Sequence, residues 1–507
     1  MSRLRLTLAL SSALVFATHF AVAETRTDIN VVAPWEISGV DPAKDGYIYL
    51  RMGVMETLVD VSPHGELRPG LALDWHASDD GLEWRFKIRK AAFHDGTSLT
   101  ADSAASALRR AASQPGPLKK APVDGVSAAG DLVTIKLKSP FAALPSVLAH
   151  SSTVIPGPAA FDATGKAVAA IGTGPFKVTT LQPPQKLETV RFNGYWGENA
   201  TLRRASYLAN KRAETRALMA ESGDADLVFT LDPAGYRRMG SVDTVTAVAA
   251  AIPRVMFLKV NAGHESLNTP EARRALSLGI DREGIAIGIT RFPEANATQL
   301  FPPVLSGWHN RELSALGYDP EEAKRLLAGE GWTPGNDGVL TRNGKRFSLT
   351  VRTFPDRPEL PLVAAAIQDQ WKAIGVELNV SVSNYSEIPK GHQDGSLELA
   401  LYARNYGLTP DPIGTVQSDF RADGSDWGTM NWNAPDVADA VAKIAATADQ
   451  TIRAPLIKAA TAKIHAELPL IPIVWYQHTM AMANKLENVV IDPLERDYGL
   501  DRIRWSR

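Results

Sequence analysis

The chain has 507 residues, of which 22% are charged and 45% hydrophobic, and its formal net charge is −2. This composition is ordinary for a folded globular protein, and the length predicts two or three domains rather than one core. The sequence has neither a basic excess nor an acidic tail, so nucleic acid is not expected as a partner. It also contains no cysteine, which agrees with export, because stray thiols oxidise outside the cytosol.

The N-terminus has the pattern of a secretory signal peptide. Two early arginines precede a mostly apolar stretch, residues 6–22, and Ala21-Val22-Ala23 fits a small-x-small cleavage site. The alternative is a buried or membrane-spanning N-terminal helix, and the polar interruptions make this stretch a poor membrane span. We therefore predict a signal peptide over residues 1–23, cleaved near Ala23, and a soluble periplasmic protein without a lipid anchor.

The first half of the mature chain alternates between strand and helix patterns. Alternating apolar residues predict three strands, over 27–33, 84–88 and 132–137. Helical spacing predicts a helix over 47–57, after a break at Asp41-Pro42. A second helix is expected over 101–112, with the Thr100 hydroxyl as its N-cap. Residues 171–176 hold two glycines and a proline, which predicts a tight turn that enters a strand.

The second half continues with interleaved α and β patterns, which indicate an α/β protein without simple repeats. Asp319 is expected to open a helix that has Pro320 at its first position. A further helix is predicted over 364–374, running directly into a strand. The apolar run 397–403 predicts a strand that ends in a Gly/Pro-rich loop, residues 404–412.

Short motifs recur in a fixed order through roughly residues 30 to 480. They include Leu58-Val59, Pro69-Gly70-Leu71-Ala72, Trp75, Asp79-Asp80-Gly81, Trp84, Phe93-His94-Asp95-Gly96, Thr100-Ala101-Asp102, Gly172-Thr173-Gly174-Pro175-Phe176, Asn193-Gly194-Tyr195-Trp196, Gly223-Asp224-Ala225-Asp226-Leu227, Phe257-Leu258-Lys259-Val260-Asn261 and Gly331-Trp332. No single motif is specific, but their order closely resembles the peptide/opine/nickel family of extracytoplasmic solute-binding proteins, family 5.

The resemblance implies an α/β, two-lobed periplasmic binding protein of the type II, cluster C-like kind, with an extra subdomain inserted in the first lobe. It also implies hinge closure around a small-molecule ligand, and delivery to the permease and ATPase subunits of an ABC importer by a monomer. The expected boundaries are 24–60, 160–258 and 480–507 for lobe I, 61–159 for its inserted subdomain, and 259–479 for lobe II.

Enzyme motifs are missing from the sequence. It has no Gly-x-Ser-x-Gly elbow, no His-Glu-x-x-His helix and no Walker loop. Because these motifs are missing, we expect that the protein is not an enzyme. Because the histidines are scattered, we also expect no local metal site and no resident cofactor. His94 is interpreted as a turn or surface residue, whereas His478 is a candidate for the cleft. The alternatives are a periplasmic hydrolase, or a chemoreceptor partner or folding helper on the same scaffold.

The loop at 404–412 supplies the first candidate ligand-binding residues, because α/β proteins present side chains to a cleft where a strand ends. Arg404 either takes a ligand carboxylate in its planar fork or forms an inter-lobe salt bridge. Tyr406 either contacts the ligand or packs in the core. Asp411 is acidic, although in the family the Asp-Pro pair is mainly a turn.

Arg357 and four aromatic residues complete the candidates. Arg357 resembles the arginine that dipeptide-binding members place on the ligand carboxylate, and a solvated loop arginine is the alternative. The aromatic candidates, which could equally be half-buried packing residues, are Trp427, Trp432, Tyr47 and Tyr49.

Leu408 stands where peptide-binding members carry an aspartate for the peptide ammonium group. The arginine and histidine that nickel-chelate members use have no convincing counterpart. We therefore expect a carboxylate-bearing ligand, either a short or modified peptide or an opine-like metal chelate, and the sequence leaves that choice open.

Overall fold

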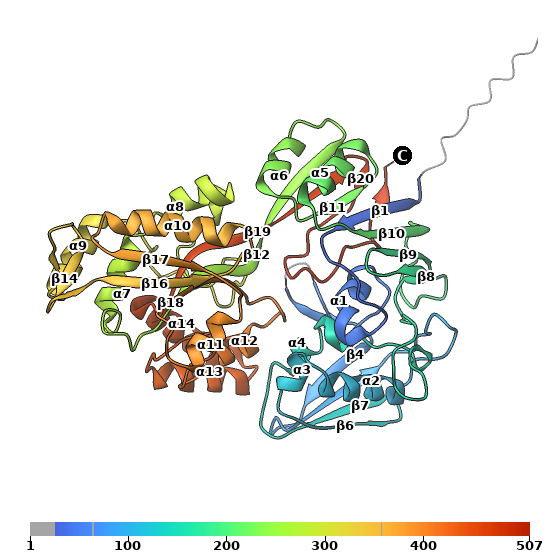
Figure 1. Cartoon of the computed structure of the whole chain (residues 1–507). Coiled ribbons are helices and arrows are strands. Elements are labelled where there is room, and N and C mark those ends of the chain that lie inside the picture. Colours follow the sequence, from blue (N-terminus) through green and yellow to red (C-terminus); the bar gives the residue numbers. More distant parts are fainter. Residues whose placement is uncertain (1–25, 63–64, 356, 507) are drawn as a thin grey trace, which may run out of the picture.

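The computed structural model describes residues 26–62, 65–355 and 357–506, and the predicted signal peptide lies outside them. Two lobes lie side by side and are joined by the long strands β12 (Val245–Val260) and β19 (Leu470–Ala483) (Figure 1). Within the described residues, no helix combines the length and apolar character that crossing a bilayer requires.

One ten-stranded sheet runs through both lobes in the order β17-β16-β18-β12-β19-β11-β1-β10-β9-β8. The lobe I strands are β1 (Asp28–Ala33), β8 (Phe176–Gln182), β9 (Lys186–Arg191), β10 (Arg204–Ala209) and β11 (Leu227–Phe229). The lobe II strands are β16 (Ser348–Thr353), β17 (Glu377–Val382) and β18 (Leu399–Asn405). Predicted strand 27–33 is confirmed as β1, and the run 397–403 as β18.

Lobe I also carries a separate four-stranded sheet in the order β4-β5-β7-β6. Its strands are β4 (Ala72–Ala77), β5 (Glu83–Ile88), β6 (Val123–Ala129) and β7 (Leu132–Leu137). The helices of lobe I are α1 (Pro42–Arg51), α2 (Ala101–Ser113), α3 (Pro117–Lys120), α4 (Leu144–Val147), α5 (Ala213–Ser222) and α6 (Pro233–Met239). Its two short strand pairs are β2 (Val59–Val61) with β3 (Leu67–Pro69), and β20 (Leu486–Glu487) with β21 (Arg504–Trp505).

Helices cover both faces of the lobe II part of the sheet. They are α7 (Pro270–Leu278), α8 (Arg282–Ile285), α9 (Pro320–Gly329), α10 (Glu359–Lys372), α11 (Glu387–Gln393), α12 (Ile413–Asp419), α13 (Pro435–Ala446) and α14 (Gln450–Glu467). A small hairpin sheet is built from β13 (Thr333–Pro334), β14 (Leu340–Arg342) and β15 (Lys345–Arg346). Met256, Leu258 and Val260 of β12 belong to the core that contains α7 and α10 residues, while Val255 and Phe257 belong to the core on the opposite face.

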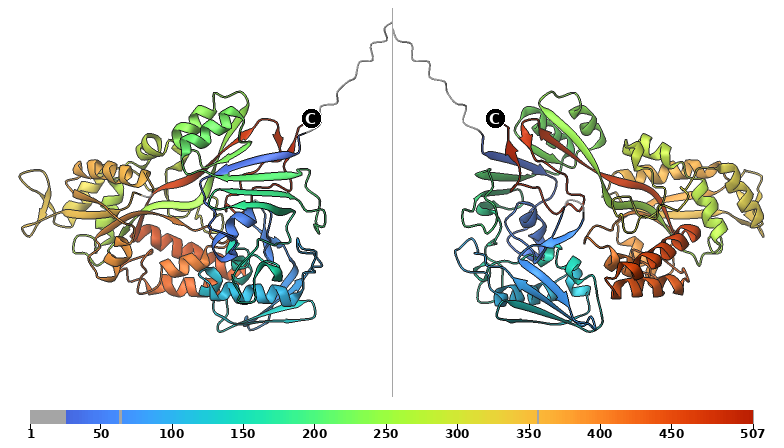
Figure 2. Two further views of the ribbon diagram at one scale, coloured as in Figure 1. Left: turned by 45° about the vertical axis from the view of Figure 1, so that its right-hand side comes forward. Right: turned by 180° about the vertical axis from the view of Figure 1, so that it is seen from behind.

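The connection between the lobes is an irregular point in two paired strands. The first part of β12, up to Ala251, pairs with the end of β19 in lobe I. From Arg254 onward β12 pairs with β18, and from Val255 also with the start of β19. The register shifts between Ala251 and Val255, where Pro253 lacks a backbone N–H for the ladder. Figure 2 shows both strands passing from one lobe to the other. The expected lobe boundaries remain a prediction.

The helix predicted at 47–57 is displaced toward the N-terminus. Asp41-Pro42 opens the helix instead of breaking the chain, because the Asp41 carboxylate accepts the Ala43 N–H at 3.1 Å and Pro42 occupies the first turn. The helix ends at Arg51, and Gly53 follows with a left-handed φ of 62°. The apolar spacing was therefore a sound sign of a helix but a poor guide to its limits.

The predicted cap of α2 is confirmed. The Thr100 hydroxyl accepts the Ser103 N–H, and the Ser103 hydroxyl accepts the Thr100 N–H, both at 3.1 Å. We expect Thr100→Ala to lower the free energy of unfolding by about 1 kcal/mol, measured by urea denaturation. Ser106→Ala on the exposed face of the same helix should leave stability unchanged or slightly higher, and an equal loss in both variants would contradict a capping role.

Candidate ligand-binding cleft between the lobes

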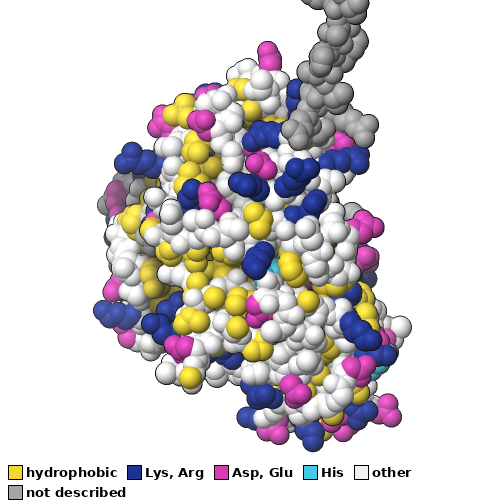
Figure 3. Space-filling model, turned by 90° about the vertical axis from the view of Figure 1, so that its right-hand side faces the viewer, with side chains coloured by type: hydrophobic (Ala, Val, Ile, Leu, Met, Phe, Trp, Pro, Cys, Tyr) yellow, Lys and Arg dark blue, Asp and Glu magenta, His cyan; other side chains and the backbone are white. Residues whose placement is uncertain are grey.

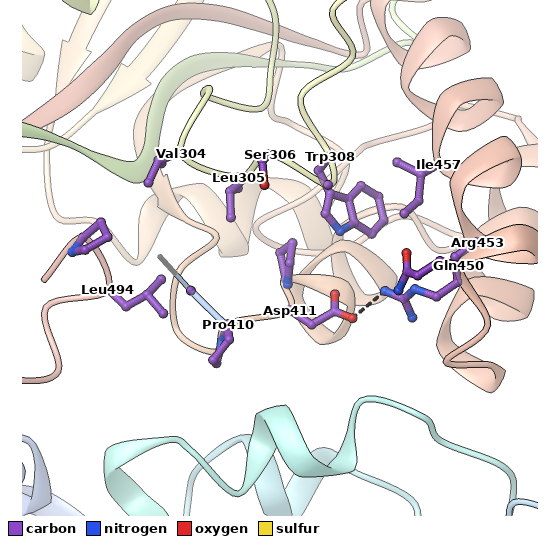
Figure 4. A pocket seen from close by; sticks show the side chains of 14 residues that line it. Val304, Leu305, Ser306, Trp308, Pro410, Asp411, Gln450, Arg453, Ile457 and Leu494 are labelled. Carbon is purple, nitrogen blue, oxygen red and sulfur yellow. Dashed lines mark hydrogen bonds and ion pairs between the residues drawn. The ribbon is translucent and has the colours of Figure 1, made fainter. Parts of the chain in front are cut away.

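One large cavity, here called cavity A, lies between lobe II and lobe I, with Gly65 and the C-terminal segment on the lobe I side. It encloses about 420 Å³. Its lining consists of Gly65, Val304, Leu305, Ser306, Gly307, Trp308, Pro410, Asp411, Pro412, Gln450, Arg453, Ile457, Pro493 and Leu494. Figure 4 shows these side chains, with a pale cyan helix of the inserted subdomain across from them. The lining of cavity A combines apolar side chains with a group of polar side chains on one side.

That polar group is an ion pair within lobe II. Arg453 Nη2 lies 2.5 Å from Asp411 Oδ2, and the Arg453 side chain is only 6% exposed. Arg453 also donates to the Ile444 carbonyl at 2.7 Å, while Asp411 accepts the N–H of Ile413, the first residue of α12. Because both charges have partners within the protein, cavity A offers little free charge to a ligand.

The inserted subdomain touches lobe II beside cavity A. The Asp411 N–H donates to Ser146 Oγ at 2.7 Å, and the Ala142 N–H donates to the Ala445 carbonyl at 2.9 Å. Ser146 lies on α4 and Ala445 on α13. Both hydrogen bonds join the two lobes across the cleft, at a distance from the crossing strands.

A second cavity, cavity B, encloses about 540 Å³. It is lined by Lys120, His392, Gln393, Arg404, Ser418, Arg421, Asp423, Gly424, Ser425, Asp426 and Trp427. Lys120 comes from the inserted subdomain and the other residues come from lobe II. Trp427 offers an aromatic face, supported by an edge-on contact with Tyr402 at 5.1 Å. Cavity B is polar, with an aromatic side and with cations from both lobes.

The cations of cavity B differ in how freely they can meet a ligand. Arg404 is engaged by the fully buried Asp419, with Nε to Oδ2 at 2.7 Å and Nη2 to Oδ1 at 2.5 Å. Burial alone would lower the pKa of Arg404, but Asp419 holds that pKa above its ordinary value, so the guanidinium remains charged. Arg421 donates to the Gly424 carbonyl, at 2.9 Å from Nη2, and lies 3.5 Å from the exposed Asp423, but its side chain is exposed and water largely screens the ion pair. Lys120 and Arg421 are therefore the more available cations.

A cluster of charges lies where the strands cross. Glu495 is 2.8 Å from Arg254, and its backbone carbonyl accepts Arg51 Nε at 2.6 Å. Burial opposes ionisation of Glu495, but Arg254 and the other nearby positive charges hold its pKa below the ordinary value. His478 Nδ1 lies 3.6 Å from Glu495, and burial lowers the pKa of His478 to about 4, so this imidazole is neutral. His478 is thus part of this cluster.

The predicted site residues separate into those beside a cavity and those away from one. Arg404 and Trp427 line cavity B, and Asp411 lines cavity A. Arg357 lies at the crossing cluster, 5.5 Å from the Tyr476 ring. The sequence left open an inter-lobe salt bridge for Arg404, but its observed partner belongs to the same lobe.

Four predicted aromatic residues have intramolecular partners. Tyr406 is fully buried and meets Phe301 edge-on at 5.1 Å. Trp432 is buried, and its indole N–H donates to Glu467 at 2.7 Å. Tyr49 is fully buried and donates to the Gly39 carbonyl, and half-buried Tyr47 donates to the Glu36 carbonyl at 2.7 Å. A ligand-binding role for these residues remains a prediction.

Several cavity residues were not predicted. Arg453 lies on the buried face of α14 with Ile457, Ala460 and Ile464. Its helical spacing from these apolar residues is a sequence signal for a charge that faces the core. Lys120 and Arg421 carry no such signal, because their importance depends on which segments meet across the cleft.

His94 is a turn residue, as predicted, but it is buried rather than on the surface. Its Nε2 donates to the Gly174 carbonyl at 2.9 Å and its Nδ1 accepts the Gly172 N–H at 3.3 Å. Burial lowers the pKa of His94 to about 4. Across the part of the chain that the structure describes, no three His, Asp or Glu side chains are grouped so that they could hold a metal ion.

Two lobes, two strands that cross between them and cavities lined from both sides define a two-lobed binding protein. The model of bacterial extracellular solute-binding proteins, family 5 Middle, matches residues 66–427. The chain belongs to this family. The match confirms the family, the fold class and the substrate-binding role that the sequence predicted.

The chain is similar to two proteins of Escherichia coli strain K12. The nickel-binding periplasmic protein is 24% identical over 535 residues, which covers 99% of each chain. The dipeptide-binding protein is 24% identical over 469 residues, which covers 85% of each. Known structures agree with the fold. The nickel ABC transporter from Bacillus halodurans has a TM-score of 0.82 at 26% sequence identity. NikA from Brucella suis in complex with Fe(III)-EDTA has a TM-score of 0.84 at 20% sequence identity. Each covers 94% of this chain and 100% of the other.

Proposed function

We propose that this protein captures a small carboxylate-bearing ligand between its lobes and delivers it to the permease of an ABC importer by hinge closure. It acts as a monomer in the periplasm after cleavage near Ala23, and it makes and breaks no covalent bond. Its relatives support this class of ligand: they include a dipeptide-binding protein, glutathione-binding proteins and a NikA whose structure contains Ni(L-His)2. All of these ligands carry carboxylates.

The observation that carries the proposal is the placement of Lys120 and Arg421 on opposite lobes around cavity B. An anionic group between them contacts both lobes at once, and a ligand that binds the closed form better than the open form shifts the protein toward closure. Cavity A has Trp308 and Leu305 in its lining, apolar side chains of the kind that bury ligand surface in binding proteins.

A direct test begins with protein taken from its source periplasm. Native mass spectrometry with metal analysis of the same sample identifies a co-purified ligand, and calorimetry with Ala-Phe, glutathione, Ni(L-His)2 and Fe(III)-EDTA compares classes of ligand. We expect binding of one carboxylate-bearing class without turnover. Binding of uncharged compounds only would overturn the ligand class, and hydrolysis of ester or peptide substrates would favour the periplasmic hydrolase.

Variants of the two more available cations test the site itself. Lys120→Met and Arg421→Met should each weaken binding of the identified ligand about tenfold, since a hydrogen bond to a charged group contributes about 1.5–3 kcal/mol. Lys119→Met is the matched control, because Lys119 is the exposed neighbour of Lys120 and does not line cavity B. Equal weakening by Lys119→Met would point to general electrostatic attraction, and unchanged binding in all three would place the ligand elsewhere.

A further inference from the structure

Lys259 is a lysine inside the apolar core of lobe II. It lies on β12 and its exposed fraction is 0%. Because strand side chains alternate, Lys259 shares the face of Val255 and Phe257, which belong to one hydrophobic core. Burying an ammonium group is costly unless polar partners replace water. An aliphatic residue would serve packing better at this position, so the lysine calls for another explanation.

The partners of Lys259 lie in one irregular segment and one helix. Its Nζ donates to the carbonyls of Ser425 and Asp426, at 2.7 and 2.9 Å. The third contact is to Nδ1 of His392 on α11 at 3.2 Å, which requires a neutral imidazole that accepts the hydrogen bond. These three acceptors match the three N–H groups of the ammonium.

The two carbonyls belong to the segment between α12 and α13 that forms one side of cavity B. We call residues 421–427 the wall loop. Its members Arg421, Gly424 and Trp427 line the cavity, as do Ser425 and Asp426 themselves. The Gly424 N–H donates to the Arg421 carbonyl at 2.9 Å, and Gly424 has a left-handed φ of 75°. The wall loop is thus a tight turn that Lys259 holds from behind.

We infer that Lys259 is a positioning residue: its buried ammonium group clamps the wall loop, shapes cavity B and releases that loop as pH rises. The effect of the clamp on ligand binding rests on the proposed function, because cavity B is the proposed site for the anionic group of the ligand. The clamp itself can be measured on ligand-free protein, so failure of either idea is distinguishable from failure of the other.

The surroundings of Lys259 make the clamp sensitive to pH. Burial lowers the pKa of Lys259 to about 7, against raising effects of Asp426 on the wall loop and Asp419 on α12, while Arg404 on β18 lowers it further. Burial and then Lys259 itself lower the pKa of His392 on α11. Asp426, Arg421 and Asp423 of the wall loop also act on His392, the aspartates raising its pKa and Arg421 lowering it. The clamp is therefore strongest below about pH 7, where Lys259 is charged, and above the pKa of His392, where the imidazole still accepts.

Global stability and wall-loop protection should respond to pH in opposite directions, and this difference separates a clamp from a merely structural lysine. The folded-state pKa of Lys259 lies below its ordinary value of 10.5. The unfolded chain therefore binds more protons between about pH 7 and 10.5, and the contribution of this group to global stability rises with pH in that window. Protection of the wall loop should fall in the same window, because its donor loses charge.

Hydrogen exchange measured by mass spectrometry on the ligand-free mature protein tests the inference. After correction for intrinsic rates, we expect protection of amides 421–427 to fall about tenfold between pH 6.5 and 8.5. Lys259→Met should lose this protection at every pH while its melting temperature is unchanged or higher. Lys372→Met, at an exposed lysine of the same lobe, should behave as wild type.

Two results would overturn the inference. One is a wall loop in Lys259→Met that is as protected as in the wild type. The other is wild-type loop protection that does not change between pH 6.5 and 8.5. The wild-type series needs no substitution, so it decides the question even if Lys259→Met fails to fold.

Discussion

Replacing Gly172 with alanine is expected to lower the free energy of unfolding by about 3 kcal/mol or more, among the larger effects of single substitutions. A Cβ at this position would lie 2.0 Å from the Val54 carbonyl oxygen and 2.8 Å from Met55 Cγ. The obstacle is backbone on a neighbouring segment, so rotation of a side chain cannot relieve it. Urea denaturation followed by circular dichroism measures the loss.

Gly125→Ala provides the matched control for this substitution. Gly125 is also in lobe I, and a Cβ there would meet nothing within 4 Å, so its stability should change by no more than about 0.5 kcal/mol. Gly174→Ala should resemble Gly172→Ala, because its Cβ would lie 2.3 Å from the Gly53 carbonyl oxygen. A Gly172 variant as stable as the Gly125 variant would mean that the turn can move away from the segment after α1.

The same turn shows how far local sequence patterns can be followed. Residues 171–176 were predicted as a tight turn entering a strand, and β8 confirms that prediction. The sequence also indicated a turn around His94. It held no sign that His94 forms hydrogen bonds with Gly172 and Gly174 of the turn at residues 171–176. Turn chemistry is local, whereas the partner of a turn depends on the folded chain.

The candidate site was harder to predict, for the same physical reason. A strand end followed by a Gly/Pro-rich loop correctly drew attention to Arg404 and Asp411, which both line cavities. Their partners, Asp419 and Arg453, lie on the later helices α12 and α14. Lys120 is brought to cavity B from the other lobe, so no pattern around it could reveal its place.

Arg404→Met should be the most damaging change in cavity B, costing about 3–5 kcal/mol of folding free energy, since removing one partner leaves a buried charge uncompensated. Asp419 has a side-chain exposure of 0%, whereas Arg404 retains 21% at the edge of the cavity. Asp419→Asn should therefore cost less, about 1–2 kcal/mol, because the remaining guanidinium can reach water. Thermal and urea denaturation measure both variants.

The double variant Arg404→Met/Asp419→Asn separates the two roles that the sequence left open for Arg404. Because its charges are removed together, we expect its stability to lie near that of Asp419→Asn and well above the sum of the single losses. The double variant and Asp419→Asn then differ mainly in whether a guanidinium is present at cavity B. If Arg404 contacts the ligand carboxylate, Asp419→Asn binds at least as tightly as the wild type and the double variant binds about tenfold or more weakly. Equal affinity in the two would assign Arg404 wholly to the ion pair and leave Lys120 and Arg421 as the anion-binding residues.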